Sequence, residues 1–436
     1  MSKLIKILSL MFILQLAGQT ANAALRVEIT KGADGAIPIA IVPFQVIGKN
    51  VQAKASVPAN VSDIIAADLE RSGKFAPKTK LAQSPQELSD VNYKFWRTAG
   101  IDHLVIGKLE VIQPNKYEIS FRLLDVVKGV QLEGYQFSAN DYDLREVSHK
   151  ISDIIYEVIT GQKGAFNTKI AYVTVQRQQG KQPVYKLQVA DTDGYKSETQ
   201  LTSRQPIMSP SWSPDGSKLA YVSFEKRKPE IYIHNIFSQK RTKVSAFEGI
   251  NGAPVWSPDG RKLALTLSKS GNPDIYILDL GSKKLTQITK HWGIDTEPGW
   301  MPDGDELVFT SSRTGKPQIY RISTRGGHPK RLTFEGKYNA SPQVSSNGRI
   351  LVHVQGEGST FRIATLDLQS GFTQTLTQGP LDESPDFAPN GAMVIYASTD
   401  KFQGVLYAVS TDGRFKQKLG VSEGDIREPT WGPFRK

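Results

Sequence analysis

Short runs in which hydrophobic and polar residues alternate fill the chain from residue 169 to its end, and they return in a fixed order. Each unit has a first run with a proline, a turn that is usually Pro-Asp-Gly or Pro-Asn-Gly, and three further runs such as residues 218–222, 275–277 and 285–289. Alternation with a period of two predicts strands that bury one face. The first-run prolines are spaced 43 or 44 residues apart: Pro210, Pro254, Pro298, Pro342, Pro385 and Pro429.

Four short strands per unit, repeated with a period in the forties, predict a β-propeller. The last unit stops after its first strand, whereas residues 169–173 resemble a second strand that has no first strand before it. We therefore expect the C-terminal strand to complete that blade, so that residues 169–436 form six blades closed by pairing of the terminal strands. Closure removes the exposed edges that an open sheet would present.

Two recurring residue types in the units invite a functional interpretation that the repeat itself explains better. The Asp of each turn could be a catalytic or calcium-binding carboxylate, but turn chemistry accounts for it. The large residues two positions after the prolines could stack on a sugar, but their recurrence favours packing between blades. These residues are Trp212, Trp256, Trp300, Val344, Phe387 and Trp431.

Residues 37–160 do not repeat, and their pattern predicts a compact α/β domain. We expect strands at residues 37–46, 101–112, 117–127 and 130–137, and helices at 61–71, from a capping box at 84–87 to Gly100, and from Asp143 to Gly161. Residues 161–168 then form a short linker to the propeller.

The first 36 residues contain two further signals. Lys3 and Lys6, an apolar run at 7–17 and Ala-Asn-Ala at 21–23 are typical of a secretory signal peptide cleaved near Ala23, with an uncleaved anchor as the alternative. Residues 24–36 then predict a strand on a glycine-containing tether. It is either an edge strand of the α/β domain or a mobile strand offered to a partner. Its alternating residues are Leu25, Arg26, Val27, Glu28, Ile29 and Thr30.

The amino-acid composition excludes several classes of function. The chain has no cysteine, which excludes thiol enzymes, zinc–thiolate sites and lipoproteins. Its net charge is +11, and from residue 166 onward 35 Lys and Arg stand against 26 Asp and Glu. The basic residues are dispersed in turns without an aromatic platform, so we do not expect nucleic-acid binding. No later apolar run is long enough to span a membrane, so we do not expect membrane insertion. We also expect a monomer.

Catalytic motifs are missing from the sequence. The six histidines show no metal-ligand spacing, and the chain has no HExxH, no Gly-x-Ser-x-Gly, no phosphate loop and no dinucleotide fingerprint. We therefore expect a protein that is not an enzyme and has no cofactor. The alternative is a lyase or glycosidase that uses carboxylates in the propeller channel to act on an envelope glycan.

The loops that enter the first strands should surround one mouth of the channel, and their residues predict an acidic mouth. The residues concerned are Asp295, Thr296, Glu297, Asp382, Glu383, Asp425 and Glu428. Loops further out hold a basic collar of Lys226, Arg227, Lys228, Arg313 and Lys316. Such a mouth could accept a cationic side chain, a calcium ion or a protein of mixed charge, or be a rim that is merely solvated.

Several segments together resemble the TolB family of the Tol–Pal envelope system. They are PIAIVPFQ (38–45), RSGKFAP (71–77), GID (100–102), TGQKGAFNTKIAYV (160–173), the segment 207–225, NGAP (251–254), LDESPDFAPNG (381–391) and STDGRFK (410–416). They cover essentially the whole chain after the signal peptide. The resemblance implies an α/β domain joined to a six-bladed propeller in a periplasmic adaptor without enzymatic activity.

The resemblance also implies partners and sites. The adaptor would link TolA to the outer-membrane lipoprotein Pal, support envelope integrity and cell division, and contact other outer-membrane proteins. The strand Leu25–Thr30 would bind TolA. Pal would dock at the mouth on Ile250, Asn251, Ala253, Thr296, Glu297, Glu383 and Glu428. One departure is Ile250, where the family has a histidine.

Overall fold

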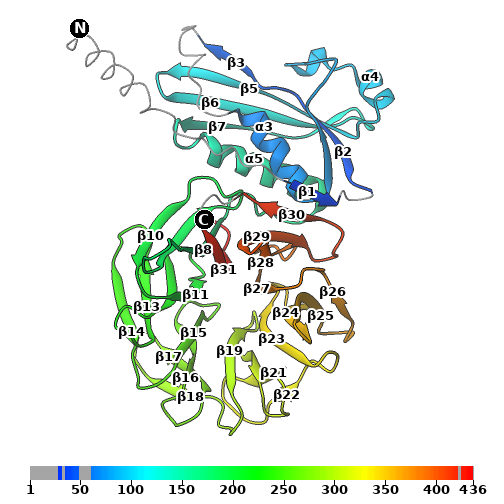
Figure 1. The fold of residues 1–436 in the computed structure, drawn as a ribbon. Coiled ribbons are helices and arrows are strands. Elements are labelled where there is room, and N and C mark those ends of the chain that lie inside the picture. Colours follow the sequence, from blue (N-terminus) through cyan, green and yellow to red (C-terminus); the bar gives the residue numbers. More distant parts are fainter. Residues whose placement is uncertain (1–27, 32–34, 49–59, 421–423, 436) are drawn as a thin grey trace, which may run out of the picture.

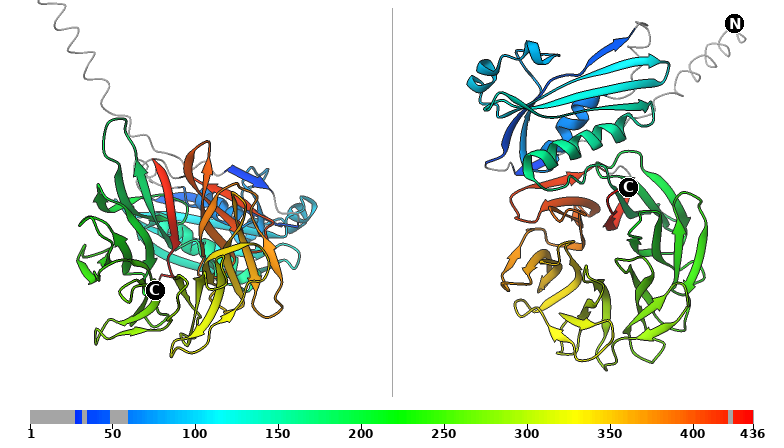
Figure 2. Two further views of the ribbon diagram at one scale, coloured as in Figure 1. Left: turned by 60° about the horizontal axis from the view of Figure 1, so that its bottom comes forward. Right: turned by 180° about the vertical axis from the view of Figure 1, so that it is seen from behind.

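The computed structural model describes residues 28–31, 35–48, 60–420 and 424–435. An α/β domain lies against one side of a ring of six β-sheets, as the sequence predicted (Figure 1). Seen from behind, the sheets surround a common centre, and the helices at residues 61–71 and 144–160 lie on the side of the α/β domain that faces the ring (Figure 2). The expected signal peptide falls outside the described residues. Within the described part, no helix is long and apolar enough to cross a membrane.

The α/β domain is built on one mixed sheet with the order β4-β2-β5-β6-β7, and β3 also pairs with β5. Pairing is parallel among β2, β4, β3 and β5, and antiparallel from β5 to β7. The strands are β2 Ile37–Ile41, β3 Gln45–Gly48, β4 Phe75–Lys78, β5 His103–Gln113, β6 Lys116–Asp125 and β7 Val130–Asn140.

Two helices, α3 (Val61–Arg71) and α5 (Leu144–Thr160), bury their apolar faces on one side of this sheet. Ile65 and Ile151 are fully buried there against strand residues such as Val105. Helix α5 ends at Gly161, which takes the left-handed conformation at φ +72° that glycine adopts without a steric penalty. The last turn of α5 thus leads directly into the linker.

The prediction of a single helix from the capping box at 84–87 to Gly100 is wrong. The structure has a short 3₁₀ helix η1 (Leu88–Asp90) and a separate helix α4 (Tyr93–Thr98), which covers the other face of the sheet through Trp96. Asn92 starts α4 by accepting a hydrogen bond from the N–H of Phe95 at 3.1 Å. Short polar side chains that bond nearby main-chain groups interrupt helices in this way.

The propeller consists of six four-stranded antiparallel units, and in five of them the strands follow chain order from the channel outwards. In the first blade the C-terminal strand β31 (Asp425–Trp431) pairs with β8, which confirms the predicted closure. That blade continues with β8 Lys169–Gln176, β9 Val184–Asp191 and β10 Glu198–Ser203. The second, third and fourth blades are β11 Ile207–Trp212, β12 Lys218–Ser223, β13 Glu230–Asn235, β14 Arg241–Ser245; β15 Asn251–Trp256, β16 Lys262–Leu267, β17 Asp274–Asp279, β18 Leu285–Gln287; and β19 Asp295–Trp300, β20 Glu306–Ser311, β21 Gln318–Ser323, β22 Lys330–Arg331.

The fifth and sixth blades are β23 Tyr338–Val344, β24 Ile350–Glu357, β25 Thr360–Asp367, β26 Thr373–Thr375; and β27 Asp382–Phe387, β28 Met393–Asp400, β29 Gln403–Ser410, β30 Lys416–Leu419. The tryptophans of the first strands pack between blades, as expected. Trp256 lies in one cluster with Ala220 and Val222 of the preceding blade. The indole N–H of Trp300 donates to the carbonyl oxygen of Val255 at 3.1 Å.

The N-terminal strand β1 (Glu28–Lys31) pairs antiparallel with β30 and makes the sixth blade five-stranded. The alternative in which this strand joins the α/β domain is therefore wrong. Figure 1 shows β1 beside β30, where the two domains meet. Leu25, Arg26 and Val27 lie outside the described residues. A strand pattern reveals alternation but not its pairing partner, because unpaired edges offer the same main-chain groups in every sheet.

Candidate functional site

The first strands of the six blades line a central cavity of about 590 Å³. Its wall contains the repeat prolines together with residues from all six blades. Asp193 in loop 191–195 and Asp412 in loop 411–415 contact the α/β domain, and Asn390 in loop 389–391 contacts the linker. These three loops lie at the opposite end of the sheets from the loops that enter the first strands. The contacts with the α/β domain are therefore remote from the mouth that the entering loops form.

Every first strand is distorted at the same place. Its pairing with the second strand shifts register around the repeat proline, as in a β-bulge. The residue before each proline has a positive φ although none is glycine, and such a conformation costs on the order of 1–3 kcal/mol. These residues are Ser209 (φ 50°), Ala253 (44°), Glu297 (52°), Ser341 (53°), Ser384 (53°) and Glu428 (48°). A ring of six strained positions therefore surrounds the channel.

Two of the strained residues are glutamates that connect one blade to the next. The carboxylate of Glu297 accepts hydrogen bonds from the N–H of Ser341 and from the hydroxyl of Thr310, both at 2.8 Å. The carboxylate of Glu428 accepts a short hydrogen bond from the N–H of Ser209. Both glutamates thus satisfy a main-chain donor that the bulge of the following blade releases from its own sheet.

Two carboxyl groups in the cavity wall have raised pKa values. Burial raises the pKa of Glu428 to about 7 against the opposing effect of the Ser209 hydrogen bond, and the nearby charge of Glu383 raises it further. Burial also raises the pKa of Asp386 to about 6, although Thr430 and the N–H of Trp431 donate to it at 2.7 and 2.8 Å. The sequence analysis missed Asp386. Its signal was available, because it is the acidic residue among those that directly follow the repeat prolines.

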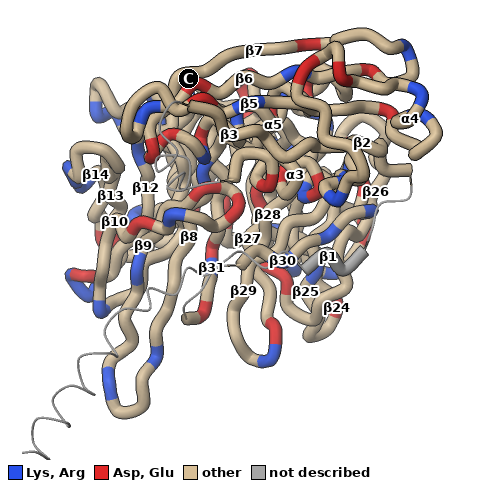
Figure 3. The backbone as a smooth tube through the Cα atoms, turned by 90° about the horizontal axis from the view of Figure 1, so that it is seen from above, with Lys and Arg blue, Asp and Glu red and all other residues tan. Residues whose placement is uncertain are grey.

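The prediction of an acidic mouth is wrong for three of its carboxylates, because neighbouring groups already engage them. Asp295 is fully buried, and Arg313 of the expected basic collar donates to both of its oxygens, at 2.9 and 3.1 Å. Asp382 is also fully buried and accepts a hydrogen bond from Ser398 at 2.6 Å. Asp425 forms an ion pair with Arg177. Figure 3, a backbone view from the side of the α/β domain, shows Lys and Arg interspersed with Asp and Glu along the chain.

The rim of the mouth carries exposed apolar side chains instead. Ile250, Ile294 and Leu381 each stand four positions before a repeat proline, and they are 46%, 50% and 41% exposed. The loops that enter these strands add Phe247 and Trp292, of which the indole is 76% exposed. Recurrence at a fixed distance from the proline was visible in the sequence. Exposed apolar side chains that cluster on one surface are typical of a site that contacts another protein.

The expected mouth residues take different places. Ala253, Glu297, Glu383 and Glu428 line the same cavity, and Ile250 lies on the rim. Thr296 is half-buried beside Thr266, 3.3 Å between their hydroxyl oxygens.

Asn251 is buried and holds its own loop. Its side chain accepts from Ser245 at 2.6 Å and donates to the carbonyl oxygen of Phe247 at 2.7 Å. Asn251 therefore fixes the conformation of the loop that carries the rim residues Phe247 and Ile250.

The described residues contain one group of side chains that could hold a metal ion, and it lies at the domain junction. His149, Asp191 and Asp193 bring their ligand atoms within 4.8 Å of one another. Cationic side chains already compensate both carboxylates, since Lys169 lies 3.0 Å from Asp191 and Arg145 forms an ion pair with Asp193. A divalent cation would meet these positive charges at short range, so the group does not fit a metal site.

Comparison with known proteins gives one consistent result. A family model described as the TolB amino-terminal domain matches residues 25–132, and one described as the TolB beta propeller domain matches residues 156–435. The Tol-Pal system protein TolB of Xanthomonas campestris pv. campestris is 52% identical over 427 residues, which are 97% of this chain and 96% of that protein. The protein of the same name from Xanthomonas oryzae pv. oryzae has the same values.

A solved structure agrees with these matches. The crystal structure of TolB from Acinetobacter baumannii superimposes with a TM-score of 0.86 at 39% sequence identity. The match covers 94% of this chain and 100% of that one. The similarity therefore extends over both domains and their junction.

Proposed function

This chain belongs to the TolB family of Tol–Pal system proteins, and from that premise we propose that it is a periplasmic adaptor without enzymatic activity. Its propeller mouth binds the outer-membrane lipoprotein Pal, and its N-terminal strand binds TolA. By linking the two, it supports outer-membrane integrity and cell division. The signal-peptide pattern at residues 1–23 supports export to the periplasm.

The observation that carries the Pal proposal is the apolar rim around the polar cavity. In the isolated chain the rim exposes apolar area that a partner could cover. This area belongs to Ile250, Ile294, Leu381 and Trp292. Behind the rim, Glu383 is exposed and Glu428 lies in the cavity wall. A partner that places apolar side chains on the rim and a donor group into the cavity would match both features. Ile250 suits such a contact by packing, where the family's histidine would hydrogen-bond.

The N-terminal strand supports the TolA proposal because only a short stretch of strand pairing attaches it to the propeller. Strand β1 has four residues and pairs on one side only, with β30. A strand held by few main-chain hydrogen bonds can exchange its partner when another sheet edge offers more pairing. The docked and released states of Leu25–Thr30 would then form a two-state switch that Pal binding biases.

One observation favours the alternative function, a lyase or glycosidase acting on an envelope glycan. Asp386 and Glu428 are two carboxyl groups in one cavity, both with raised pKa values, and a carboxyl group with a raised pKa can serve as a general acid. Both also accept hydrogen bonds from main-chain N–H groups of a neighbouring blade. That role in holding the ring favours the adaptor.

Calorimetric titration with the periplasmic domain of Pal tests the proposal. The chain from Ala24 onward is compared with an Ile250→Asp/Ile294→Asp variant. The matched control is Phe237→Asp/Phe372→Asp, two side chains of 75% and 66% exposure at the opposite end of the sheets. We expect the rim variant to lose at least about tenfold in affinity, equivalent to 1.4 kcal/mol, and the control to bind like the parent.

A second titration uses the periplasmic domain of TolA and an Ile29→Asp variant, for which we expect weaker binding. Failure of the parent chain to bind Pal would overturn the adaptor proposal at the mouth. Unchanged affinity in the rim variant would place the Pal site elsewhere on the protein. Release of soluble fragments from purified envelope glycans, abolished by Asp386→Asn, would instead establish the enzymatic alternative.

A further inference from the structure

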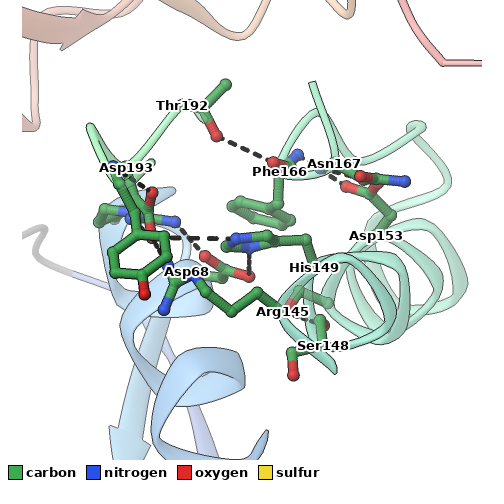
Figure 4. A network of polar contacts seen from close by, with 12 residues as sticks. Asp68, Arg145, Ser148, His149, Asp153, Phe166, Asn167, Thr192 and Asp193 are labelled. Carbon is green, nitrogen blue, oxygen red and sulfur yellow. Dashed lines mark hydrogen bonds and ion pairs between the residues drawn. The ribbon is translucent and has the colours of Figure 1, made fainter. Parts of the chain in front are cut away.

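The junction between the two domains contains a buried polar network that the adaptor function does not use. Helix α3 contributes Asp68 and Arg71, helix α5 contributes Arg145 and His149, and the turn between β9 and β10 of the propeller contributes Asp193 (Figure 4). Apart from Arg145, these side chains are at most 7% exposed. A buried ionic network at a junction is costly unless every charge is paired.

His149 is the centre of this network. Its Nδ1 lies 2.7 Å from a carboxylate oxygen of Asp68, and its Nε2 lies 3.8 Å from a carboxylate oxygen of Asp193. The Nε2 atom is buried and has no hydrogen-bond partner. The ring therefore stands between a carboxylate of the α/β domain and a carboxylate of the propeller.

The protonation state of the His149 ring determines whether its contact with Asp193 is repulsive or attractive. A neutral imidazole that donates from Nδ1 to Asp68 turns the lone pair of Nε2 towards Asp193, and lone pair and carboxylate repel each other. A second proton on Nε2 makes the ring cationic, so that both nitrogens face a carboxylate as donors. Protonation thus converts a repulsive contact across the junction into an attractive one.

We propose that His149 is a proton-operated clamp that tightens the contact between the α/β domain and the propeller when the ring is protonated and loosens it when the ring is neutral. This regulation is independent of the proposed adaptor function. It makes the junction that also holds strand β1 sensitive to the pH of the compartment.

The remaining charges around the ring are consistent with this assignment. Burial lowers the pKa of His149, but Asp68 and Asp193 raise it by a larger amount in total, even though Arg71 opposes them. Burial raises the pKa of Asp193, but Arg71, His149 and Arg145 together bring it below its ordinary value. Asp193 therefore stays ionised where His149 titrates.

Three further charged groups belong to the same region. Asp191 lies near the ring and pairs with Lys169 at 3.0 Å. Asp153, further along α5, accepts hydrogen bonds from the N–H groups of Phe166 and Asn167 in the linker at 2.7 and 3.2 Å. Burial raises its pKa to about 7, so it titrates in a neighbouring range and must be controlled for.

The sign of the pH effect follows from linkage. A histidine whose pKa is raised on folding stabilises the folded form fully below the unfolded value of 6.5, and the contribution is lost as pH rises through the folded pKa. Asp153 acts in the same direction, but between its unfolded value of 3.8 and about 7. Both contributions are lost as pH rises, so the Asp153 titration has to be removed before the His149 contribution is measured.

The experiment measures the His149 ring and the junction in the same samples. Two-dimensional NMR of the histidine rings gives each titration, and the signal of His149 is the one missing from His149→Gln. Hydrogen exchange at the amide of Tyr195, which donates to Asp193 at 3.0 Å, reports opening of the propeller turn. An Asp153→Asn background removes the second titration, and His328→Gln, at an exposed histidine, is the control.

We expect the His149 ring to titrate above 6.5 and the protection of the Tyr195 amide to fall as pH rises through the pKa of that ring. The fall should be about tenfold for each unit by which the folded pKa exceeds the unfolded one. The pH dependence should disappear in His149→Gln and persist in His328→Gln. Asp193→Asn should lower the pKa of the His149 ring. A ring that titrates below 6.5, or equal pH dependence in the parent and His149→Gln, would overturn the proposal.

Discussion

The carboxylate of Glu297 accepts a hydrogen bond from the main-chain N–H of Ser341, the residue 44 positions later that occupies the same place in the next blade. Both residues have a positive φ and both precede a repeat proline. One strained position therefore uses its side chain to satisfy the donor that strain exposes at the next. The ring is held at its centre by such contacts as well as by the tryptophans between the sheets.

This relationship predicts different effects for two substitutions of Glu297. One carboxylate oxygen accepts both hydrogen bonds, from Ser341 and Thr310, so the amide oxygen of Glu297→Gln can replace it. Glu297→Ala leaves both donors without that partner and should lower the free energy of unfolding by about 1.5–3 kcal/mol. Urea denaturation of both variants provides the measurement. Equal stability of the two variants would contradict the role of the side chain as an acceptor.

The pairing of Arg313 with Asp295 predicts a large loss when only one partner is removed. Arg313→Ala leaves a fully buried carboxylate without its cation, which typically costs about 3–5 kcal/mol. The double variant Asp295→Leu/Arg313→Met removes both charges and should lose much less. Thermal and urea unfolding of the single and double variants give the two values. A single variant within about 1 kcal/mol of the parent would show that water reaches Asp295.

The propeller could be predicted from the sequence because its evidence is periodic and local. A proline, a turn and three alternating runs at a fixed interval determine strand, turn and blade, and the unpaired run at 169–173 determines the closure. The prediction of one helix at 84–100 failed for a local reason as well, since Asn92 accepts from the N–H of Phe95, a group that a continuous helix would pair with an earlier carbonyl.

The charges of the site could not be predicted, because their compensation comes from residues that no local pattern connects. Asp295 and Arg313 are 18 positions apart on neighbouring segments, and His149 and Asp68 are 81 apart in different helices. The sequence shows which residues enter the mouth but not which of them have a partner. The apolar rim and Asp386 occupy fixed positions in the repeat, so the sequence alone contains the signal for both.

The close approach of Gly73 to Phe415 predicts a glycine requirement at the domain junction. Gly73 follows helix α3 with φ +67°, and a Cβ atom there would lie 2.5 Å from the Cβ and Cγ atoms of Phe415 in the propeller. Gly73→Ala should therefore cost about 1–3 kcal/mol through backbone strain and crowding. Gly100→Ala is the matched control, since it also has a positive φ (69°) but has no atom within 4 Å of the added methyl group. If both variants lose the same stability, the loss comes from φ alone and the contact with Phe415 contributes nothing.

His353 predicts an acid sensitivity of opposite sign to that of His149. The ring is 1% exposed in strand β24, neither nitrogen has a partner, and burial lowers its pKa to about 4. Because the unfolded value is 6.5, the unfolded chain binds the proton first, and stability falls as pH drops from about 6.5 towards 4. The difference in pKa corresponds to about 3 kcal/mol at the lower end.

The variant His353→Met tests this prediction. Methionine is apolar and does not titrate, so this part of the acid sensitivity should be absent from the variant. Urea denaturation of the parent, His353→Met and the exposed control His328→Gln at pH 7, 5.5 and 4.5 provides the comparison. If the parent and His353→Met lose stability in parallel over this range, the imidazole is protonated inside the fold and the burial argument is wrong.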